Sequence, residues 1–258
     1  MKAKKEFGQN FLINEDTINS IVSFCNVTSD DLIIEIGPGR GALTKHLSKL
    51  GANLVCFEID TDMKNYLSKY ESETTKVIYQ DILTVNLKDV LANYTYSNLY
   101  VVGNLPYYIT SPILEFLIES DINIYKMIFM VQKEVADRYS AKNGSSNFGY
   151  MTLYLNHYYE VKKELFVPKN YFNPVPKVDS AVITLNLKNV LEVDNEKEFF
   201  TFLKKCFQYK RKTLKNNLSN FDFDKIENYL IENGFQKTVR PEEIPEEIFI
   251  EIYKLLKR

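Results

Sequence analysis

Long apolar runs, an excess of one charge and abundant cysteine are all missing from this sequence. No apolar stretch approaches the roughly 18 residues of a membrane span, and the basic start is not followed by a signal-peptide core. The formal net charge of -2 gives no overall positive excess to attract nucleic acid. The three cysteines, Cys25, Cys56 and Cys206, are odd in number, far apart and set among apolar residues, which favours buried thiols in a reducing compartment. We expect a cytoplasmic protein with no membrane anchor.

Several catalytic signatures are missing as well. The two histidines, His46 and His157, fall on an expected helix and just before a late strand, and neither accompanies a Ser or Cys nucleophile in a recognisable triad. The chain has no G-x-x-x-x-G-K-[ST] loop, and no His, Cys or Asp spacing indicates a metal site. These absences argue against triad hydrolases, P-loop enzymes and metalloenzymes.

What remains is an ordinary globular composition. The 258 residues are 45% hydrophobic and 26% charged, enough for a full core and a second small domain. Five apolar runs alternate with helical patterns, and two later runs form a closing pair. The expected strands are residues 32–36, 53–57, 77–79, 99–102, 125–131, 158–166 and 180–187.

Helices are expected at 42–50, from an N-cap at Ser111 that precedes Pro112, and at 133–141. From about Leu187 onward apolar residues recur at helical spacing only. The sequence therefore predicts an α/β fold: a Rossmann-like, seven-stranded mixed sheet with helices on both faces, plus a small all-α C-terminal domain. The expected domains are 1–187 and 188–258.

A glycine-rich turn, Gly37-Pro-Gly-Arg-Gly41, directly follows the strand at 32–36 and precedes an expected helix. Strand, glycine turn and helix in this order bring bare backbone up to a ligand. Glu58 ends the next strand about 20 residues further on, where an acid typically accepts from ribose hydroxyls. The sequence predicts a nucleoside-bearing cofactor, but the pattern Gly37-x-Gly39-x-x-Ala42 also suits dinucleotides.

Two further acids accompany this loop. Glu35 lies in the apolar strand, and because burying it unpaired is costly, we expect it to meet backbone donors of the loop or a ligand amino group. Asp81 follows the third strand beside Ile82, where it could bind an adenine amino group while Ile82 packs on the ring. A helix-cap role for Asp81 explains the same position equally well.

The fourth strand ends at Asn104-Leu-Pro-Tyr107, where Pro106 forces the chain out of the sheet. Ligands of open α/β sheets sit beyond the carboxyl ends of strands, so Asn104 and Tyr107 are expected to face a bound molecule. The Asn104 amide can accept hydrogen bonds from a flat amine, and Tyr107 offers a ring for stacking. A plain strand followed by a proline turn is the alternative.

Three other stretches are weaker candidates. Gln9 and Asn10 are amides between two phenylalanines and could contact a ligand. The loop Phe172-Asn-Pro-Val-Pro-Lys-Val-Asp-Ser180 is stiffened by two prolines and could hold Phe172 as a second stacking face, or serve only as a connector. A run without acids could contact RNA phosphates or form a solvated helix face, and contains Lys204, Lys205, Lys210, Arg211, Lys212 and Lys215.

Four motifs together resemble the ribosomal RNA adenine dimethyltransferases. They are Gly8-Gln-Asn-Phe-Leu12, Glu35-Ile-Gly-Pro-Gly-Arg-Gly41, Asn104-Leu-Pro-Tyr107 and Phe172-Asn-Pro-Val-Pro-Lys-Val-Asp-Ser180, in the order and spacing of that family. Arg211-Lys-Thr-Leu-Lys-Asn-Asn-Leu218 and Arg240-Pro-Glu-Glu-Ile244 further resemble its small-subunit branch. This chain departs from the family pattern in its low overall charge, which leaves the extent of its RNA-binding surface open.

The resemblance implies a class I methyltransferase fold in which domain 1–187 binds S-adenosylmethionine and domain 188–258 binds RNA. It implies dimethylation at N6 of two adjacent adenines near the 3′ end of small-subunit rRNA, late in assembly of a pre-30S-type particle, by a monomer. The cofactor contacts implied are Gln9, Asn10, Leu12, Glu35, Gly37, Gly39, Gly41, Glu58, Ile59, Asp81, Ile82 and Asn104. The target adenine is expected to meet Asn104, Leu105, Pro106 and Tyr107 and to stack on Phe172.

Other functions fit parts of the pattern. The glycine loop permits a nucleotide-dependent oxidoreductase, which would bind a nicotinamide dinucleotide. The fold and basic run permit an assembly or transcription factor without turnover, although Asn104 and Tyr107 argue against it. Methylation of large-subunit rRNA or of DNA keeps the chemistry, and Leu105, in place of the proline common in DNA adenine methylases, disfavours DNA.

Overall fold

The computed structural model describes residue 4 and residues 7–257, which form two compact units. The first contains residues up to Ala136 together with Lys162–Leu187, and the second contains Asp137–Val161 together with residues from Lys188 onward. Residues 137–161, which the sequence analysis placed in domain 1–187, therefore have most of their contacts with the helical tail. No helix in the described part of the chain is both long and apolar enough to span a bilayer.

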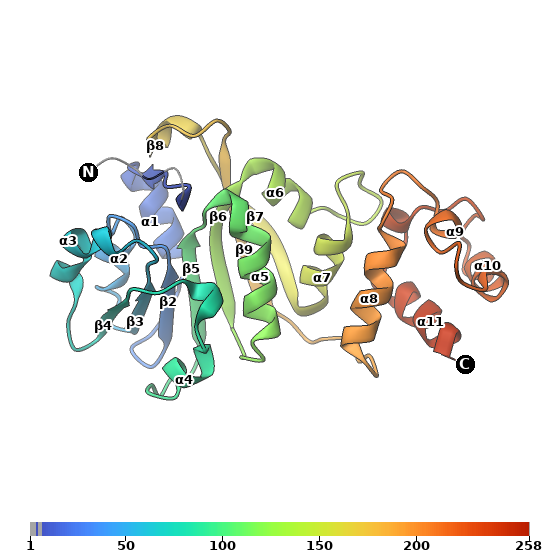
Figure 1. Ribbon diagram of the computed structural model, residues 1–258, viewed down its shortest axis with the longest axis horizontal. Helices are drawn as coiled ribbons and strands as arrows, with labels where there is room; N and C mark the ends of the chain where they lie inside the picture. Colours follow the sequence, from blue (N-terminus) through green and yellow to red (C-terminus); the bar gives the residue numbers. More distant parts are fainter. Residues whose placement is uncertain (1–3, 5–6, 258) are drawn as a thin grey trace. The chain divides into compact units, whose positions relative to one another are not determined.

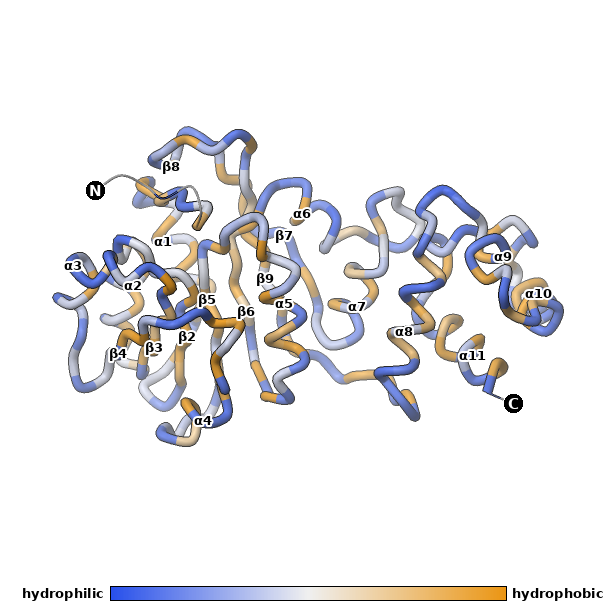
Figure 2. Tube along the Cα trace, in the orientation of Figure 1, coloured by the Kyte–Doolittle hydropathy of each residue, from blue (hydrophilic) through white to orange (hydrophobic). Residues whose placement is uncertain are grey.

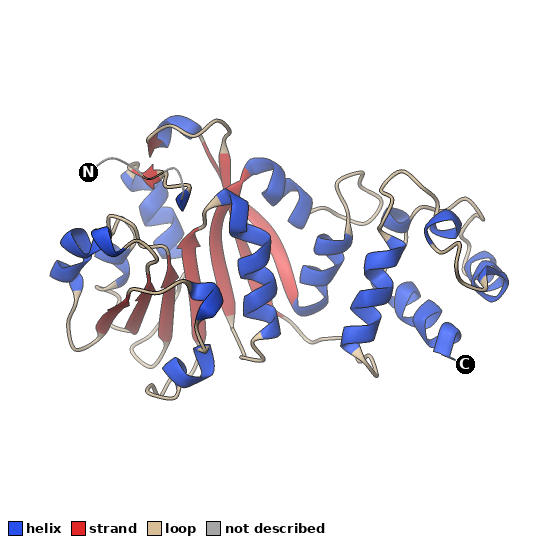
Figure 3. Cartoon of the chain, in the orientation of Figure 1, coloured by secondary structure: helices blue, strands red, loops and turns tan. Residues whose placement is uncertain are grey.

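A seven-stranded mixed sheet, in the order β4-β3-β2-β5-β6-β9-β7, forms the centre of the first unit (Figures 1 and 3). The first five strands in this order, β4, β3, β2, β5 and β6, run parallel to one another, whereas β9 is antiparallel to β6. This confirms the predicted fold class, including the closing pair. The strands are β2 Leu32–Ile36, β3 Asn53–Phe57, β4 Thr75–Ile78, β5 Leu99–Asn104, β6 Lys126–Gln132, β7 Tyr159–Val167 and β9 Ser180–Leu187.

The central strands are hydrophobic along their length because helices cover both faces of a parallel sheet (Figure 2). Every residue of β2 is buried. On one face, side chains from α1 (Glu15–Ser23) and α2 (Thr44–Leu47) join a core cluster with Ile33, Leu54 and Tyr100 from the sheet. Figure 1 shows α5 (Thr110–Glu119) passing in front of the other face. Two shorter helices of this unit are α3 Lys64–Leu67 and α4 Leu87–Leu91.

Two expected helix starts are wrong. The helix expected at 42–50 is only the single turn α2, because residues 39–43 remain in turns after the glycine loop. Ser111 is not an N-cap, since the 3-10 turn Tyr107–Ile109 runs straight into α5 at Thr110. Pro112 still lies in the first turn of the helix, where its missing N–H costs nothing.

A second, two-stranded sheet lies beside the glycine-rich turn of the first unit. It pairs β1 (Phe11–Leu12) antiparallel with β8 (Phe172–Asn173), so that Phe11 faces Asn173 and Leu12 faces Phe172. It joins the start of the chain to the proline-containing loop before β9.

The second unit is helical. Its core is aromatic, with Phe199 near Tyr253 and Phe207 near Phe249. Buried His157 lies between Glu246, at the start of α11, and Glu196, at the start of α8. The helix at 150–158 was missed because most of its residues are buried and leave no polar stripe to mark the period. The helices are α6 Lys133–Tyr139, which begins in the first unit, then α7 Tyr150–Tyr158, α8 Glu196–Cys206, α9 Leu214–Asn217, α10 Phe223–Glu232 and α11 Glu246–Lys257.

Candidate active site

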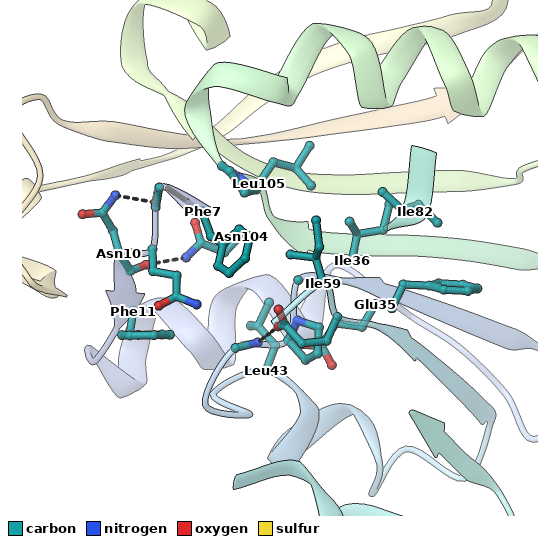
Figure 4. A pocket seen from close by; sticks show the side chains of 18 of the residues that line it. Phe7, Asn10, Phe11, Glu35, Ile36, Leu43, Ile59, Ile82, Asn104 and Leu105 are labelled. Atoms are coloured by element: carbon teal, nitrogen blue, oxygen red, sulfur yellow. Dashed lines mark hydrogen bonds between the residues drawn. The ribbon is translucent and has the colours of Figure 1, made fainter. Parts of the chain in front are cut away.

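A cavity of about 430 Å³ opens at the carboxyl ends of β2, β3 and β5 (Figure 4). Parallel strands end on the same edge, so residues far apart in sequence meet there. All twelve residues expected to contact the cofactor line this cavity, and Leu105, Pro106 and Tyr107 line it too. Their individual roles as ligand contacts stay predictions. The described residues contain no group of three or more His, Cys, Asp and Glu side chains arranged to hold a metal ion.

Both backbone conformation and space require glycine at Gly39 and Gly41. Gly39 and Gly41 have positive φ values of 56° and 81°. A Cβ on Gly41 would come within 2.5 Å of the Tyr70 ring, and one on Gly39 within 3.0 Å of the Phe11 ring. The loop therefore presents bare backbone to the cavity, which is the surface that a closely bound nucleoside needs.

Glu58 ties this loop to the end of β3. Its carboxylate accepts from the backbone N–H of Gly39 at 2.9 Å and from that of Asp60 at 2.9 Å. Burial raises the pKa of Glu58, although these two backbone donors oppose the shift. The carboxylate is fixed at the cavity wall with lone pairs remaining, a suitable acceptor for ribose hydroxyls.

Glu35 lies beneath the loop and is almost fully buried. It accepts from the Thr44 hydroxyl at 2.7 Å and from the Cys56 thiol at 3.5 Å. The expected partners were backbone donors of the glycine loop or a ligand amino group, and these two side chains were not foreseen. Burial raises the pKa of Glu35 to about 7. Glu35 supports the cavity floor through these two bonds.

Glu35→Gln is expected to flatten part of the pH dependence of stability. The folded pKa of about 7 exceeds the ordinary 4.5, so the folded protein holds a proton that the unfolded chain releases. The free energy of unfolding therefore falls as pH rises from 4.5 through about 7. At about 1.4 kcal/mol per unit, the loss attributable to Glu35 reaches about 3 kcal/mol.

Urea unfolding of both proteins at about pH 5 and about pH 8 measures this difference. Because the pKa of Glu58 is also raised, some decline should persist in the variant. An equal decline in the parent and the variant contradicts the assignment.

Asp81 fulfils the capping role weighed in the sequence analysis. Its Oδ1 accepts from the backbone N–H of Leu83 at 3.0 Å, at the start of the turn Ile82–Thr84. Asp81 and Ile82 also line the cavity, so capping does not remove them from it. Binding of an adenine amino group by the second carboxylate oxygen stays a prediction.

Asn104 and Tyr107 are each held by a specific partner. The Asn104 Nδ2 donates to the main-chain carbonyl of Asn10 at 2.9 Å, as Figure 4 shows. The Tyr107 hydroxyl lies 2.7 Å from the Ser180 hydroxyl, which is buried at the start of β9. Ser180 ends the proline-containing motif, and this position was the only sequence signal for its role. The bond between the two hydroxyls fixes the tilt of the Tyr107 ring at the cavity wall.

Phe172 does not offer the stacking face expected from the sequence. Only 1% of the residue is exposed, and it packs in the same core cluster as Leu12. Its backbone pairs with β1, which turns the ring into the core, and Phe172 is absent from the cavity lining. The aromatic rings that the loop after β5 contributes to the cavity lining are those of Tyr107 and Tyr108, and Tyr108 is 59% exposed.

The six basic residues of the run from Lys204 to Lys215 are all exposed. Lys204 and Lys205 lie over the rings of Tyr150 and Phe221, and Lys215 pairs with Glu227. Lys210, Arg211 and Lys212, in the loop between α8 and α9, have no ion-pair partner among the described residues. Their charges are available to an external anion, and RNA contact stays a prediction.

Comparisons with known proteins show which sequences this chain is similar to. A family model described as "Ribosomal RNA adenine dimethylase" matches residues 1–258. "Ribosomal RNA small subunit methyltransferase A" of Mycoplasma capricolum is 38% identical over 261 residues, covering 99% of this chain and 98% of that protein. The protein of the same name from Lactobacillus helveticus is 41% identical over 266 residues, covering 98% and 90%.

Two solved structures share the fold. A dimethyladenosine transferase from Plasmodium falciparum superposes with a TM-score of 0.77 at 24% identity, covering 96% of this chain and 97% of that one. The 23S rRNA methyltransferase ErmE superposes with a TM-score of 0.74 at 24% identity, covering 96% and 100%. At this identity the two structures support the architecture only.

Proposed function

The chain belongs to the ribosomal RNA adenine dimethylase family, and from this premise we propose that it methylates small-subunit rRNA. The proposed reaction transfers methyl groups from S-adenosylmethionine to N6 of two adjacent adenines near the 3′ end of that RNA, late in assembly of the particle. Relatives of 38% and 41% identity carry a small-subunit name, which supports this branch over the large-subunit alternative.

One observation carries the proposal: the Asn104 amide lines the cavity with its nitrogen already bonded to the Asn10 carbonyl. This bond turns the amide oxygen away from the Asn10 carbonyl and leaves it as the acceptor available to a substrate. An acceptor at the end of β5, beside the loop that Glu58 anchors, suits a donor N–H such as the exocyclic amine of adenine.

The cavity fits the proposed cofactor. The glycine loop lines the cavity, and Glu58 offers a carboxylate for ribose hydroxyls. Asp81 and Ile82, which line the cavity, would hold the adenine. When bound, S-adenosylmethionine supplies a methyl group on a sulfonium sulfur.

The residues present suffice for transfer without a strong base. The lone pair of adenine N6 is delocalised into the ring, but the amine attacks as a neutral group and loses its proton afterwards to water. Acceptance of its hydrogens by Asn104 Oδ1 and the Leu105 carbonyl would favour a pyramidal nitrogen aimed at the methyl group. Transfer would form the N–C bond as the C–S bond of the donor breaks, and the sulfur would keep the electron pair.

The adenine must leave its stack first, which costs a few kcal/mol. Each aromatic contact can return about 1–3 kcal/mol. Tyr107 is the ring that we assign to this role, because its hydroxyl is anchored on Ser180 and its side chain lines the cavity.

The test is incubation with labelled S-adenosylmethionine and unmodified small-subunit particles, followed by mapping of the labelled nucleotide. We expect dimethyladenosine at two adjacent positions near the 3′ end, and no label in large-subunit RNA supplied as the control. Label confined to large-subunit RNA would establish the alternative branch. Binding of a nicotinamide dinucleotide with no methyl transfer would overturn the proposal.

A further inference from the structure

Lys4 and Phe7–Asn10 contact two different parts of the site. We name Lys4 together with Phe7–Asn10 the N-terminal strap; all of it except Lys4 lines the cavity. At one end, Lys4 Nζ lies 2.7 Å from Asp60 and 2.7 Å from Asp62. Gln9 Nε2 donates to the second Asp60 oxygen at 2.7 Å, and Gln9 Oε1 accepts from the Lys4 backbone N–H at 2.9 Å. The strap is thus attached just beyond the end of β3.

At its other end the strap contacts the loop after β5. Gly8 has a positive φ of 58°, and a Cβ there would lie 3.1 Å from the Tyr108 ring. The Asn10 side chain bonds back to the Gly8 carbonyl at 3.0 Å, which fixes the turn. The Asn10 carbonyl then accepts from Asn104 Nδ2 at 2.9 Å.

This last bond selects one orientation of the Asn104 amide. A carbonyl oxygen can only accept, so the Asn104 nitrogen must face it, because the flipped amide would set two oxygens against each other. Oδ1 is then left for the cavity, and none of the described residues donates to it. Without the Asn10 carbonyl the amide would turn freely, and half of its orientations would present N–H groups to an incoming amine.

We propose that the strap is a positioning element for methyl transfer: attached to Asp60 through Lys4 and Gln9, it holds the Asn10 carbonyl where it locks Asn104 Oδ1 toward the substrate. Asp60 is only 1% exposed and is a positioning residue, since it acts through the strap. This inference rests on the proposed function for the role of Asn104 in transfer, but the orientation of the amide can be measured without any activity.

Asp60→Asn and Gln9→Glu each break the attachment. The first sets an amide nitrogen against Gln9 or Lys4, and the second sets two carboxylates together. We expect each to lower the single-turnover rate about 10-fold at saturating S-adenosylmethionine. The double variant Gln9→Glu/Asp60→Asn restores the pair with donor and acceptor exchanged, and should return to within about 3-fold of the parent. This rescue separates a lost attachment from a misfolded protein.

The direct readout is the side-chain amide signal of Asn104 in protein labelled with ¹⁵N-asparagine, identified by its loss in Asn104→Ala. We expect slow solvent exchange of these protons in the parent and the double variant, and fast exchange in both single variants. Glu73→Gln, which removes an exposed carboxylate outside the cavity, is the matched control and should leave both signal and rate unchanged.

Unchanged Asn104 exchange in the single variants would overturn the proposal. So would single-turnover rates equal to the parent's at saturating S-adenosylmethionine together with weaker cofactor binding, since the strap would then serve cofactor binding alone. A parent without methyl transfer would refute the proposed function instead, and the exchange measurement would still decide whether Asp60 controls the amide.

Discussion

Asn104→Ala is expected to lower methyl transfer about 10²- to 10³-fold, the effect of removing one oriented polar group from a reacting centre. The alanine cannot accept from the substrate amine, so the nitrogen is neither oriented nor made pyramidal. Cofactor affinity should change little, because the glycine loop and Glu58 remain bonded to each other. The loss should therefore fall on the rate and not on cofactor binding.

Single-turnover transfer and equilibrium binding of S-adenosylmethionine measure the two quantities separately. Asn93→Ala removes an exposed asparagine whose amide bonds only to nearby helix carbonyls, and it is the matched control. Turnover of Asn104→Ala close to that of the parent would refute the catalytic assignment.

Replacement of Lys210, Arg211 and Lys212 by glutamine should weaken binding to single-stranded rRNA about 100-fold at 0.1 M salt. Each lost phosphate contact reduces the slope of log K against log salt by about 0.7, so three lower it by about 2. Because these side chains have no ion-pair partner among the described residues, stability should be unaffected. The low net charge of -2 makes such a local cluster more important for RNA binding.

Binding measured over a series of salt concentrations tests this result. The control variant replaces Lys49, Lys64 and Lys225, three exposed lysines outside the cluster, and removes the same total charge. If both triple variants show the parent's slope, the cluster is a solvated surface and RNA contacts lie elsewhere.

The sheet was predictable from the sequence because its strands are nearly continuous apolar runs with β-branched residues, as in Leu32–Ile36. The cavity lining was predictable for a related reason: polar residues that follow such runs must gather at one edge. α7 was not predictable in this way, since a helix buried on most sides has no amphipathic period.

The burial of Phe172 could not be predicted from sequence patterns, for a different reason. Its burial depends on pairing between β8 and β1, and no local rule specifies contacts between strands so distant in the chain. The same holds for the bond from Tyr107 to Ser180 and for that from Asn104 to the Asn10 carbonyl. The motifs identified the segments that form the site, whereas the hydrogen bonds between these segments are visible only in the folded structure.

The pairing of β1 with β8 also sets the order in which the molecule can be completed during synthesis. Phe11 and Leu12 emerge first but have no partner strand until Phe172 and Asn173 have been made. Such a distant pairing forms late, because the long intervening loop must close first. A nascent chain that stops before β8 would carry the glycine loop and Asn104 while this part of the cavity wall stayed unpaired.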